Sequence, residues 1–292
     1  MRFTITRRWR WKHEAAAQQN SSNAALSIMD FVAQIGKVVI DSLAYLGALA
    51  TLVARSAFCV FIGPFQKRPI RWQRVINQAA EVGVRALPIL SLITFFIGLI
   101  FALQFANELR KLGAMNQVAT GVAVAISREL GPLITAILVI GRSGSAFAAE
   151  IGTMRVTEEI DALEVMAIEP VEFLVVPKFV AMIIMMPCLT LWANTMGILG
   201  GGLFGVTGAG FTWGRYIRSS LDALSLHDIT TGLLKSVMFG VTITAVGCYE
   251  GLATGGGAEE IGRSTTRAVV MSIFLVILVD LIFTAIFFAS NQ

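Results

Sequence analysis

Long stretches without charged residues alternate with short polar segments along this chain. The fully uncharged runs cover 86–106, 179–214 and 236–249, and nearly uncharged runs cover 130–149 and 268–289. A helix needs about 20 predominantly apolar residues to cross the hydrocarbon core of a bilayer. The alternating pattern of a transmembrane β-barrel is missing from the sequence. The pattern therefore predicts an all-α, polytopic membrane protein with about five transmembrane helices.

The five expected spans differ in how regular they are. We expect them at Ala86–Ala106, from Val118 to Ala149, within 173–213, at Ile229–Tyr249 and at Ala268–Ala289. The second is too long for one straight crossing, and Pro132 removes a helical hydrogen bond, so we expect a broken or steeply tilted helix there. The third contains Pro187 and ends in GILGGGLFGVTGAG. Glycine at this density lets helix backbones approach closely.

Three regions follow from this pattern. Residues 1–25 form a basic N-terminal arm, residues 26–85 form interfacial or elbow helices, and residues 86–292 form the five-span membrane domain. Within the second region, residues 43–63 would span the membrane if Arg55 snorkels or pairs. A helix that lies in the membrane interface is the alternative, and we favour it slightly.

A short acidic segment, Arg155–Glu169, separates the second and third spans. One helical face is apolar and comprises Val156, Ile160, Leu163 and Ala167. The other face is acidic and comprises Glu158, Glu159, Asp161 and Glu164. Thr157 suits the N-terminus of such a helix, and Pro170 ends it. Because a helix that lies on anionic lipid would be basic, the acidic face favours docking into a partner protein, with a solvated loop helix as the alternative.

Composition and charge support the membrane interpretation. The chain has 292 residues, of which 55% are hydrophobic and 14% charged, against about 25% charged residues in soluble domains. The net charge is +4, and the N-terminal RRWRWK is its most basic stretch. This motif could bind nucleic acid, but a juxtamembrane basic segment with interfacial tryptophans is commoner in a membrane chain. We therefore expect a cytoplasmic N-terminus and no nucleic-acid partner.

Several charged residues fall at membrane depth. They are Arg128, Glu129, Arg142, Glu150, Lys235 and Asp280. A charge at the centre of a spanning helix costs about 2.5–3.5 kcal/mol on insertion scales, so such residues pair or line a polar path. An Arg142–Asp280 ion pair that fixes helix packing and a polar path for a head group stay equally open. For Glu129 and Lys235 we favour one shared cavity, whereas Arg128–Glu129 is either an ion pair or a lipid contact.

Catalytic machinery is not visible in the sequence. Ser143 and Ser145 have no histidine nearby, and the carboxylates do not show metal-ligand spacing. The three cysteines are far apart in apolar sequence, which is typical of reduced core residues. No GxxxxGK[ST] motif occurs. We therefore expect no catalytic residues, metal or cofactor, and no ATPase site of the chain's own.

The stretch RELGPLITAILVIGRSGSAFAAEIGTMRVTEEIDALEVMAIEP, residues 128–170, resembles the signature of the MlaE (YrbE-type) permeases. These are the membrane subunits of ABC transporters that move phospholipid together with MCE-domain proteins. LLKSVMFG (233–240), GCYEG (247–251) and STTRAVVMS (264–272), followed by Asp280 and Thr284, resemble the last two helices of that family. The resemblance runs from about Phe65 to the C-terminus.

The resemblance implies a homodimer of five-span subunits in a bacterial inner membrane. Each subunit would have an N-terminal interfacial helix, and an outward-facing cavity would lie at the dimer centre. The partners of the homodimer would be a pair of cytoplasmic ABC ATPase subunits and a ring of MCE proteins. A small STAS-type cytoplasmic subunit is an optional further partner.

The resemblance also assigns roles to individual segments. Segment 155–169 would be the coupling helix seated on the ATPase. Five residues match positions in the family's motifs: Arg128, Glu129, Asp228, Lys235 and Arg267. Of these, we expect Glu129 and Lys235 to line the lipid cavity.

The expected mechanism is mechanical. ATP-driven closure of the partner pushes the coupling helices, the spans around Pro132 and Pro187 shift, and the dimer cavity is squeezed or opened to lipid. Two rivals are an ATP-independent carrier with inverted repeats and a membrane scaffold that binds partners without transport. We see no internal repeat in the sequence, and the carrier would leave the acidic segment unexplained. Co-purification of an ATPase would separate the scaffold from the transporter.

Overall fold

The computed structural model describes residue 34, residues 36–60 and residues 72–290. The predicted basic arm 1–25 and the last residues of segment 43–63 lie outside these described residues. The chain divides into two compact units, Met1–Thr51 and Leu52–Gln292. The regions predicted from the sequence, with boundaries at residues 25 and 85, stay a prediction.

The described residues form helices and turns and contain no strand. Six helices are long and apolar enough to cross a membrane: Gly36–Val60, Trp72–Lys111, Met115–Val156, Val171–Thr207, Leu226–Leu252 and Ala258–Ala289. The last five correspond to the five predicted spans, which confirms the prediction of an all-α polytopic membrane protein. The first covers most of segment 43–63, and its length and composition suit a span. Its placement across the membrane or in the interface stays open.

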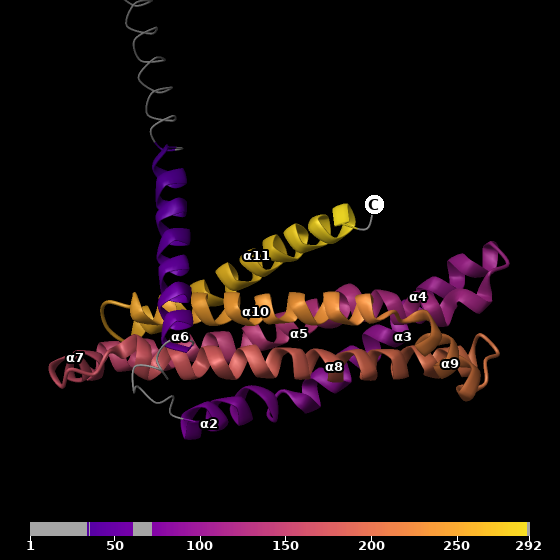
Figure 1. Ribbon diagram of the computed structural model, residues 1–292, viewed down its shortest axis with the longest axis horizontal. Helices are drawn as coiled ribbons and strands as arrows, with labels where there is room; N and C mark the ends of the chain where they lie inside the picture. The colour runs from indigo at the N-terminus through magenta and orange to yellow at the C-terminus, as the bar shows by residue number, and fades with distance from the viewer. Residues whose placement is uncertain (1–33, 35, 61–71, 291–292) are drawn as a thin grey trace, which may run out of the picture. The chain divides into compact units, whose positions relative to one another are not determined.

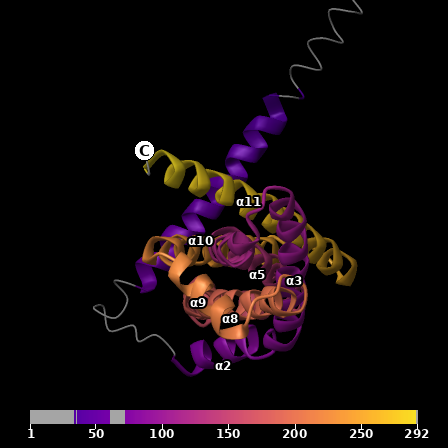
Figure 2. The same ribbon diagram turned by 90° about the vertical axis from the view of Figure 1, so that its right-hand side faces the viewer.

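In the second unit, the long helices pack side by side (Figures 1 and 2). They are α2 (Trp72–Gly83), α3 (Leu87–Lys111), α8 (Val176–Thr207), α10 (Leu226–Leu252) and α11 (Ala258–Ser290). Viewed from one end, α8 lies between α2 on one side and α10 on the other, and α11 covers α10 (Figure 2). The short helix α7 (Glu159–Val165) lies at one end of the bundle and α9 (Trp213–Ala223) at the other (Figure 1).

The second predicted span is one helical path of 42 residues, from Met115 to Val156. Its α-helical parts are α4 (Val118–Ala125), α5 (Gly131–Val139) and α6 (Ser145–Val156). Two π turns join them, η3 (Ile126–Leu130) and η4 (Ile140–Gly144).

Of the two alternatives for the second span, a break at Pro132 is excluded, because the π turn η3 accommodates the proline. The steep tilt stays a prediction. Pro132 has no N–H to donate to the preceding turn. The N–H of Gly131, the residue before it, reaches back five residues to the carbonyl of Ile126. The helix widens here and continues, as π turns inside α-helices commonly do. Pro187 likewise lies inside a continuous α8.

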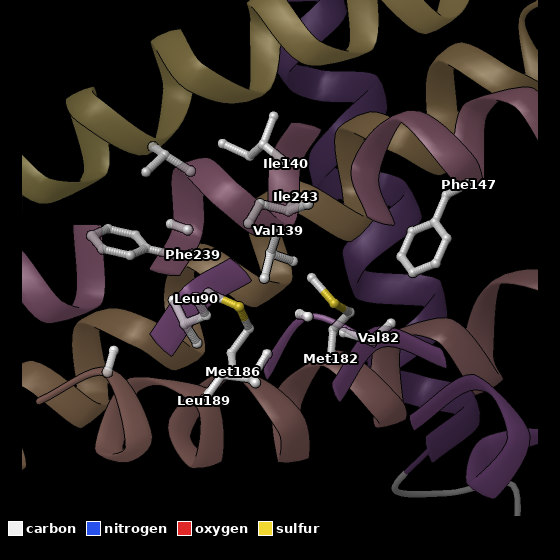
Figure 3. Close-up of a cluster of buried hydrophobic side chains, with 14 residues drawn as sticks. Val82, Leu90, Val139, Ile140, Phe147, Met182, Met186, Leu189, Phe239 and Ile243 are labelled. Atoms are coloured by element: carbon white, nitrogen blue, oxygen red, sulfur yellow. The ribbon is translucent and has the colours of Figure 1, made fainter. Parts of the chain in front are cut away.

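A cluster of buried apolar side chains joins α8 to the helices around it (Figure 3). It includes Val82, Leu90, Val139, Ile140, Phe147, Met182, Met186, Leu189, Phe239 and Ile243. These residues come from α2, α3, α5, η4, α6, α8 and α10, and each is at most 1% exposed. The cluster fixes the relative positions of the long helices on which the polar cavity described below depends.

Glycines bring α3 and α8 into backbone contact. A Cβ atom on Gly98 would lie 1.8 Å from the carbonyl oxygen of Gly197, and one on Gly200 would lie 1.9 Å from that of Phe95. Real Cβ atoms do not come this close, so both positions require glycine. The predicted close approach at the glycine-rich stretch is confirmed.

The same stretch of α8 holds α9 through Tyr216. The ring of Tyr216 is fully buried, and a Cβ atom on Gly205 would lie 2.6 Å from it. The ring of Phe211 packs edge-on against it, with 6.2 Å between centroids. Burial raises the pKa of Tyr216 to about 12, because the charged phenolate would lose its solvation. Tyr216 therefore fastens the connection between α8 and α10.

Candidate functional site

A polar cavity of about 310 Å³ opens between η3, α10 and α11. Its lining residues are Arg128, Glu129, Thr231, Lys235, Thr284, Phe287 and Phe288. Three of these, Arg128, Glu129 and Lys235, were predicted from the sequence, and the structure brings all three to one cavity. Their role in binding a substrate stays a prediction.

The π turn and one glycine make this arrangement possible. A Cβ atom on Gly232 would lie 2.2 Å from the carbonyl oxygen of Ser127, so α10 touches the backbone of η3 at that glycine. Residues Arg128 and Glu129 follow Ser127 directly, and Lys235 stands one helical turn beyond Gly232. Close backbone contact therefore places the ammonium of Lys235 beside the carboxylate of Glu129.

The ammonium of Lys235 contacts three oxygen atoms of the protein. It donates to Glu129 Oε2 at 2.5 Å and to Thr284 Oγ1 at 2.7 Å, and it lies 3.0 Å from Asp280 Oδ1. A lysine ammonium has three N–H groups, and three oxygen atoms surround this one. The side chain is 1% exposed. Lys235 therefore lies at the base of the cavity and fixes the groups around it.

The Arg142–Asp280 ion pair, one of the two alternatives that the sequence left open, does not form. Asp280 lies beside Lys235 instead. Arg142, on η4, donates to the backbone carbonyl of Arg85, in the non-helical turn that joins α2 to α3. A carbonyl in a turn is not satisfied by a helical hydrogen-bond ladder, and a guanidinium is well suited to donate to it.

Arg128 pairs with Asp228 rather than with its neighbour Glu129. The Nε atom of Arg128 lies 3.4 Å from Asp228 Oδ1. The other oxygen of Asp228 accepts hydrogen bonds from the backbone N–H and the hydroxyl of Ser225, at 3.0 and 2.8 Å. The backbone N–H of Asp228 donates to Ser225 Oγ at 3.1 Å, which completes a capping box at the start of α10. The helix cap therefore fixes the carboxylate that orients Arg128.

The sequence predicts one helix over 155–169, but the structure divides this acidic segment. Helix α6 ends at Val156, Glu158 is left-handed with φ 60°, and α7 covers only Glu159–Val165. Thr157 does not begin a helix, since its hydroxyl donates back to the carbonyl of Thr153 at 3.0 Å. A hydroxyl that bonds to the preceding turn completes the end of α6.

The acidic face of this segment is exposed as predicted, but the apolar residues at its centre are covered by the chain itself and not left free for a partner. The apolar anchors Ile160 and Leu163 are 2% and 8% exposed, so they pack inside the chain. Glu158, Glu159, Asp161 and Glu164 are exposed, and Asp161 pairs with Arg155 at 2.5 Å. The apolar side chains that face outward are Val165 and Met166, at 88% and 61% exposed. A partner would therefore meet an acidic surface with these two apolar residues.

A second buried charge lies closer to α7, and sequence reasoning did not single it out. Lys178, on α8, is 2% exposed and donates to Glu150 Oε2 at 2.6 Å and to Gln78 Oε1 at 3.3 Å. Its ammonium lies 4.8 Å from the ring centroid of Phe147. The signal was a single lysine at the start of a long apolar run.

The described part of the chain contains no candidate metal site. Among residue 34 and residues 36–60 and 72–290, no group of three or more His, Cys, Asp or Glu side chains could hold a metal ion. The carboxylates of the cavity are engaged by Lys235 and Arg128.

Comparison with known proteins places this chain among membrane permeases. A family model described as Permease MlaE matches residues 75–286. A protein named intermembrane phospholipid transport system permease protein MlaE, from Haemophilus influenzae, is 36% identical over 267 residues, which cover 90% of this chain and 100% of the relative.

Two relatives from Rickettsia bear the name probable ABC transporter permease protein. The one from Rickettsia prowazekii is 38% identical over 229 residues, covering 78% of this chain and 88% of the relative. The one from Rickettsia bellii is 40% identical over 220 residues, covering 75% and 85%. In each case the match covers most of both chains.

Proposed function

The chain belongs to the MlaE permease family, and we propose that it is the membrane subunit of an ABC transporter that moves phospholipid. In this proposal the lipid passes between the inner membrane and an MCE-protein partner, and a separate ATPase supplies the energy. The chain itself performs no bond chemistry.

The observation that carries the proposal is the charged cavity within an otherwise apolar bundle. Arg128 and Glu129 present side chains that are 37% and 41% exposed, while Lys235 and Asp228 hold them from behind. Ionisable residues at membrane depth are expensive and usually mark a path for a polar group. A lipid head group is a polar group that has to leave the membrane surface during transport.

The packing of α6 supports the proposed coupling to an ATPase. Helix α6 leads directly into the acidic α7 region, and it packs against both α10 and α11. A Cβ atom on Gly247 would lie 2.8 Å from the carbonyl of Gly144, and one on Gly251 would lie 3.1 Å from that of Ala148. Close backbone contacts transmit displacement with little slack. A push on α7 would therefore move α10, which carries Lys235.

A second copy of the chain is the partner that we propose for α11. Apolar side chains stand exposed along it: Val270, Phe274, Ile277, Leu278, Leu281 and Ile282. In a homodimer these faces would meet, and the two cavities would open toward a common centre. The pair of ATPase subunits and the small STAS-type subunit would lie on the α7 side. In this proposal the membrane is a bacterial inner membrane and the N-terminus is cytoplasmic. The MCE ring would lie on the α9 side.

Purification of the chain from native membranes tests this function. We expect an ABC ATPase and phospholipid to co-purify with it. The double variant Val165→Ser/Met166→Ser should lower recovery of the ATPase about tenfold, a factor that corresponds to roughly 1.4 kcal/mol. Leu112→Ser is the matched control, because Leu112 is 77% exposed in the turn after α3, away from α7.

The rival functions make different predictions for the same purification. An ATP-independent carrier would bind lipid without any ATPase. A scaffold would recover partners without lipid. Absence of an ABC ATPase from the purified wild-type complex would refute the proposal.

A further inference from the structure

The cavity presents one cation and one anion to its interior. Arg128 makes a single ion-pair contact, through Nε to Asp228 at 3.4 Å. Within the described part of the chain, its two terminal nitrogens donate no hydrogen bond. A guanidinium with free terminal N–H groups is suited to bidentate contact with a phosphate. Arg128 therefore offers a phosphate site.

Glu129 is the anion, and it is fixed in position. Its Oε2 accepts from Lys235 at 2.5 Å, and its Oε1 accepts from the Thr284 hydroxyl at 3.1 Å. Each carboxylate oxygen has two lone pairs, so each keeps one acceptor site. The side chain is 41% exposed, whereas Lys235 is 1% exposed. A ligand therefore meets the carboxylate of Glu129 and not the ammonium of Lys235.

The two charges that a ligand meets in the cavity are of opposite sign. Arg128 and Glu129 line the cavity and are partly exposed, Lys235 is covered, and Asp228 and Asp280 are not among the lining residues. A zwitterionic head group places an opposite charge beside each of the two. A head group with a net negative charge has no cation for Glu129, and like charges in a site of reduced dielectric repel.

Aromatic rings extend the preference for a cation. Phe287 and Phe288 complete the lining of the cavity. The face of an aromatic ring attracts an ammonium group that lies over it. The volume of about 310 Å³ is at the small end of ligand pockets, which suits a head group better than a whole lipid with two chains.

We propose that this cavity selects a zwitterionic phospholipid head group, with its phosphate on Arg128 and its ammonium on Glu129. The proposal rests on the proposed function, since it names the lipid class that the transporter would prefer. Arg128 supplies affinity for any phospholipid, because all of them carry the phosphate. Glu129 supplies the preference, because only the ammonium-bearing lipids match it.

The composition of the bound lipid tests the proposal. The complete transporter is reconstituted into bilayers of equimolar phosphatidylethanolamine and phosphatidylglycerol, re-extracted, and its retained lipid is quantified by mass spectrometry. We expect the wild type to enrich phosphatidylethanolamine about two- to fivefold, the factor that one partly exposed ion pair supplies. Glu129→Gln should return the ratio to that of the bilayer, and Glu129→Asp should keep the enrichment.

Further variants separate preference from affinity and from folding. Arg128→Gln should lower the retained amount of both lipids. Glu108→Gln is the matched control, because Glu108 is an exposed carboxylate at the end of α3, paired with Lys111 and outside the cavity. Annular lipid contributes equally to every sample, so the difference between wild type and Glu129→Gln reports the cavity.

A competition measurement on the wild-type transporter needs no variant. Short-chain phosphatidylethanolamine should displace a bound fluorescent phospholipid at about two- to fivefold lower concentration than short-chain phosphatidylglycerol. Equal displacement, or an enrichment that survives Glu129→Gln, would overturn the selectivity while lipid binding and ATP-driven transport left the proposed function standing. Absence of any retained lipid together with absence of ATP-driven transport would overturn both.

Discussion

Replacement of Lys235 by methionine tests whether this lysine fixes the cavity. Methionine has a similar length and fills the same space, but it removes the cation between Glu129 and Asp280. Both carboxylates then lose their ion-pair partner at 2.5 and 3.0 Å. The hydroxyl of Thr284 loses the ammonium that donates to it at 2.7 Å.

The cost of this replacement follows from the burial of the groups left behind. Removal of one partner from a buried ion pair costs about 3–5 kcal/mol, because the other charge stays unpaired. Asp280 is 19% exposed and would bear most of this cost, whereas Glu129 is 41% exposed and is partly solvated. We therefore expect Lys235→Met to lower the free energy of unfolding by about 3 kcal/mol, at the lower end of that range.

The assay is thermal unfolding of the purified chain in detergent. A loss of about 3 kcal/mol corresponds to a fall in Tm of roughly 6 °C or more for a domain of this size. Adding Glu129→Gln and Asp280→Asn to Lys235→Met removes the unpaired charges, so the triple variant should recover most of the lost Tm. An unchanged Tm for Lys235→Met would refute the structural role of Lys235 and favour a direct contact with lipid instead.

The remaining predictions concern the helix contacts and the two ends of the bundle. Gly200→Ala should prevent folding or lower Tm by several degrees, because its Cβ would lie 1.9 Å from a carbonyl oxygen of α3. Gly214→Ala is the control and should do neither, because the space around Gly214 is open. Size-exclusion profiles and Tm measure both variants. The pKa of Tyr216 is raised to about 12, so the stability that this residue contributes is complete below pH 10 and is lost as the pH rises from about 10 to 12. Tyr216→Phe should remove that part of the alkaline loss in Tm. The same dependence of Tm on pH in the wild type and in Tyr216→Phe would contradict this prediction. Val165→Ser/Met166→Ser should leave Tm unchanged while it weakens ATPase binding, because both side chains are exposed.

The membrane helices could be predicted from the sequence because the signal is long. Each apolar run extends over many residues. Because a charged residue in lipid is energetically costly, charged residues mark the two ends of each run. The contact between Glu129 and Lys235 was also predictable, since two opposite charges at membrane depth have few other groups to meet. The helix Gly36–Val60 gave a weaker signal, because charged residues interrupt its apolar pattern.

The choice of ion-pair partners could not be predicted in full. Arg142 and Asp280 have opposite charges, yet pairing depends on the level of each residue along its helix and on the side it faces. The sequence contains neither quantity. The carbonyl that Arg142 satisfies belongs to the backbone at Arg85, and a free carbonyl in a turn leaves no mark in side-chain patterns.

The acidic segment shows a different limit. Its periodicity was interpreted as one helix with an apolar docking stripe, and the stripe exists, but Ile160 and Leu163 pack against the chain itself. Periodicity reveals which residues share a face and not what covers that face. The left-handed residue Glu158 splits the segment, and its neighbour Thr157 bonds backward to α6.

The account is tested most directly by lipid transfer in proteoliposomes. The purified chain, together with the ATPase that co-purifies with it, is reconstituted with a fluorescent phospholipid, and removal of the lipid by an MCE-domain acceptor is followed with and without ATP. The account predicts transfer that requires ATP and that falls when Arg128 is replaced by glutamine. Transfer at the same rate without ATP, or no transfer from a folded and ATP-hydrolysing complex, would contradict it.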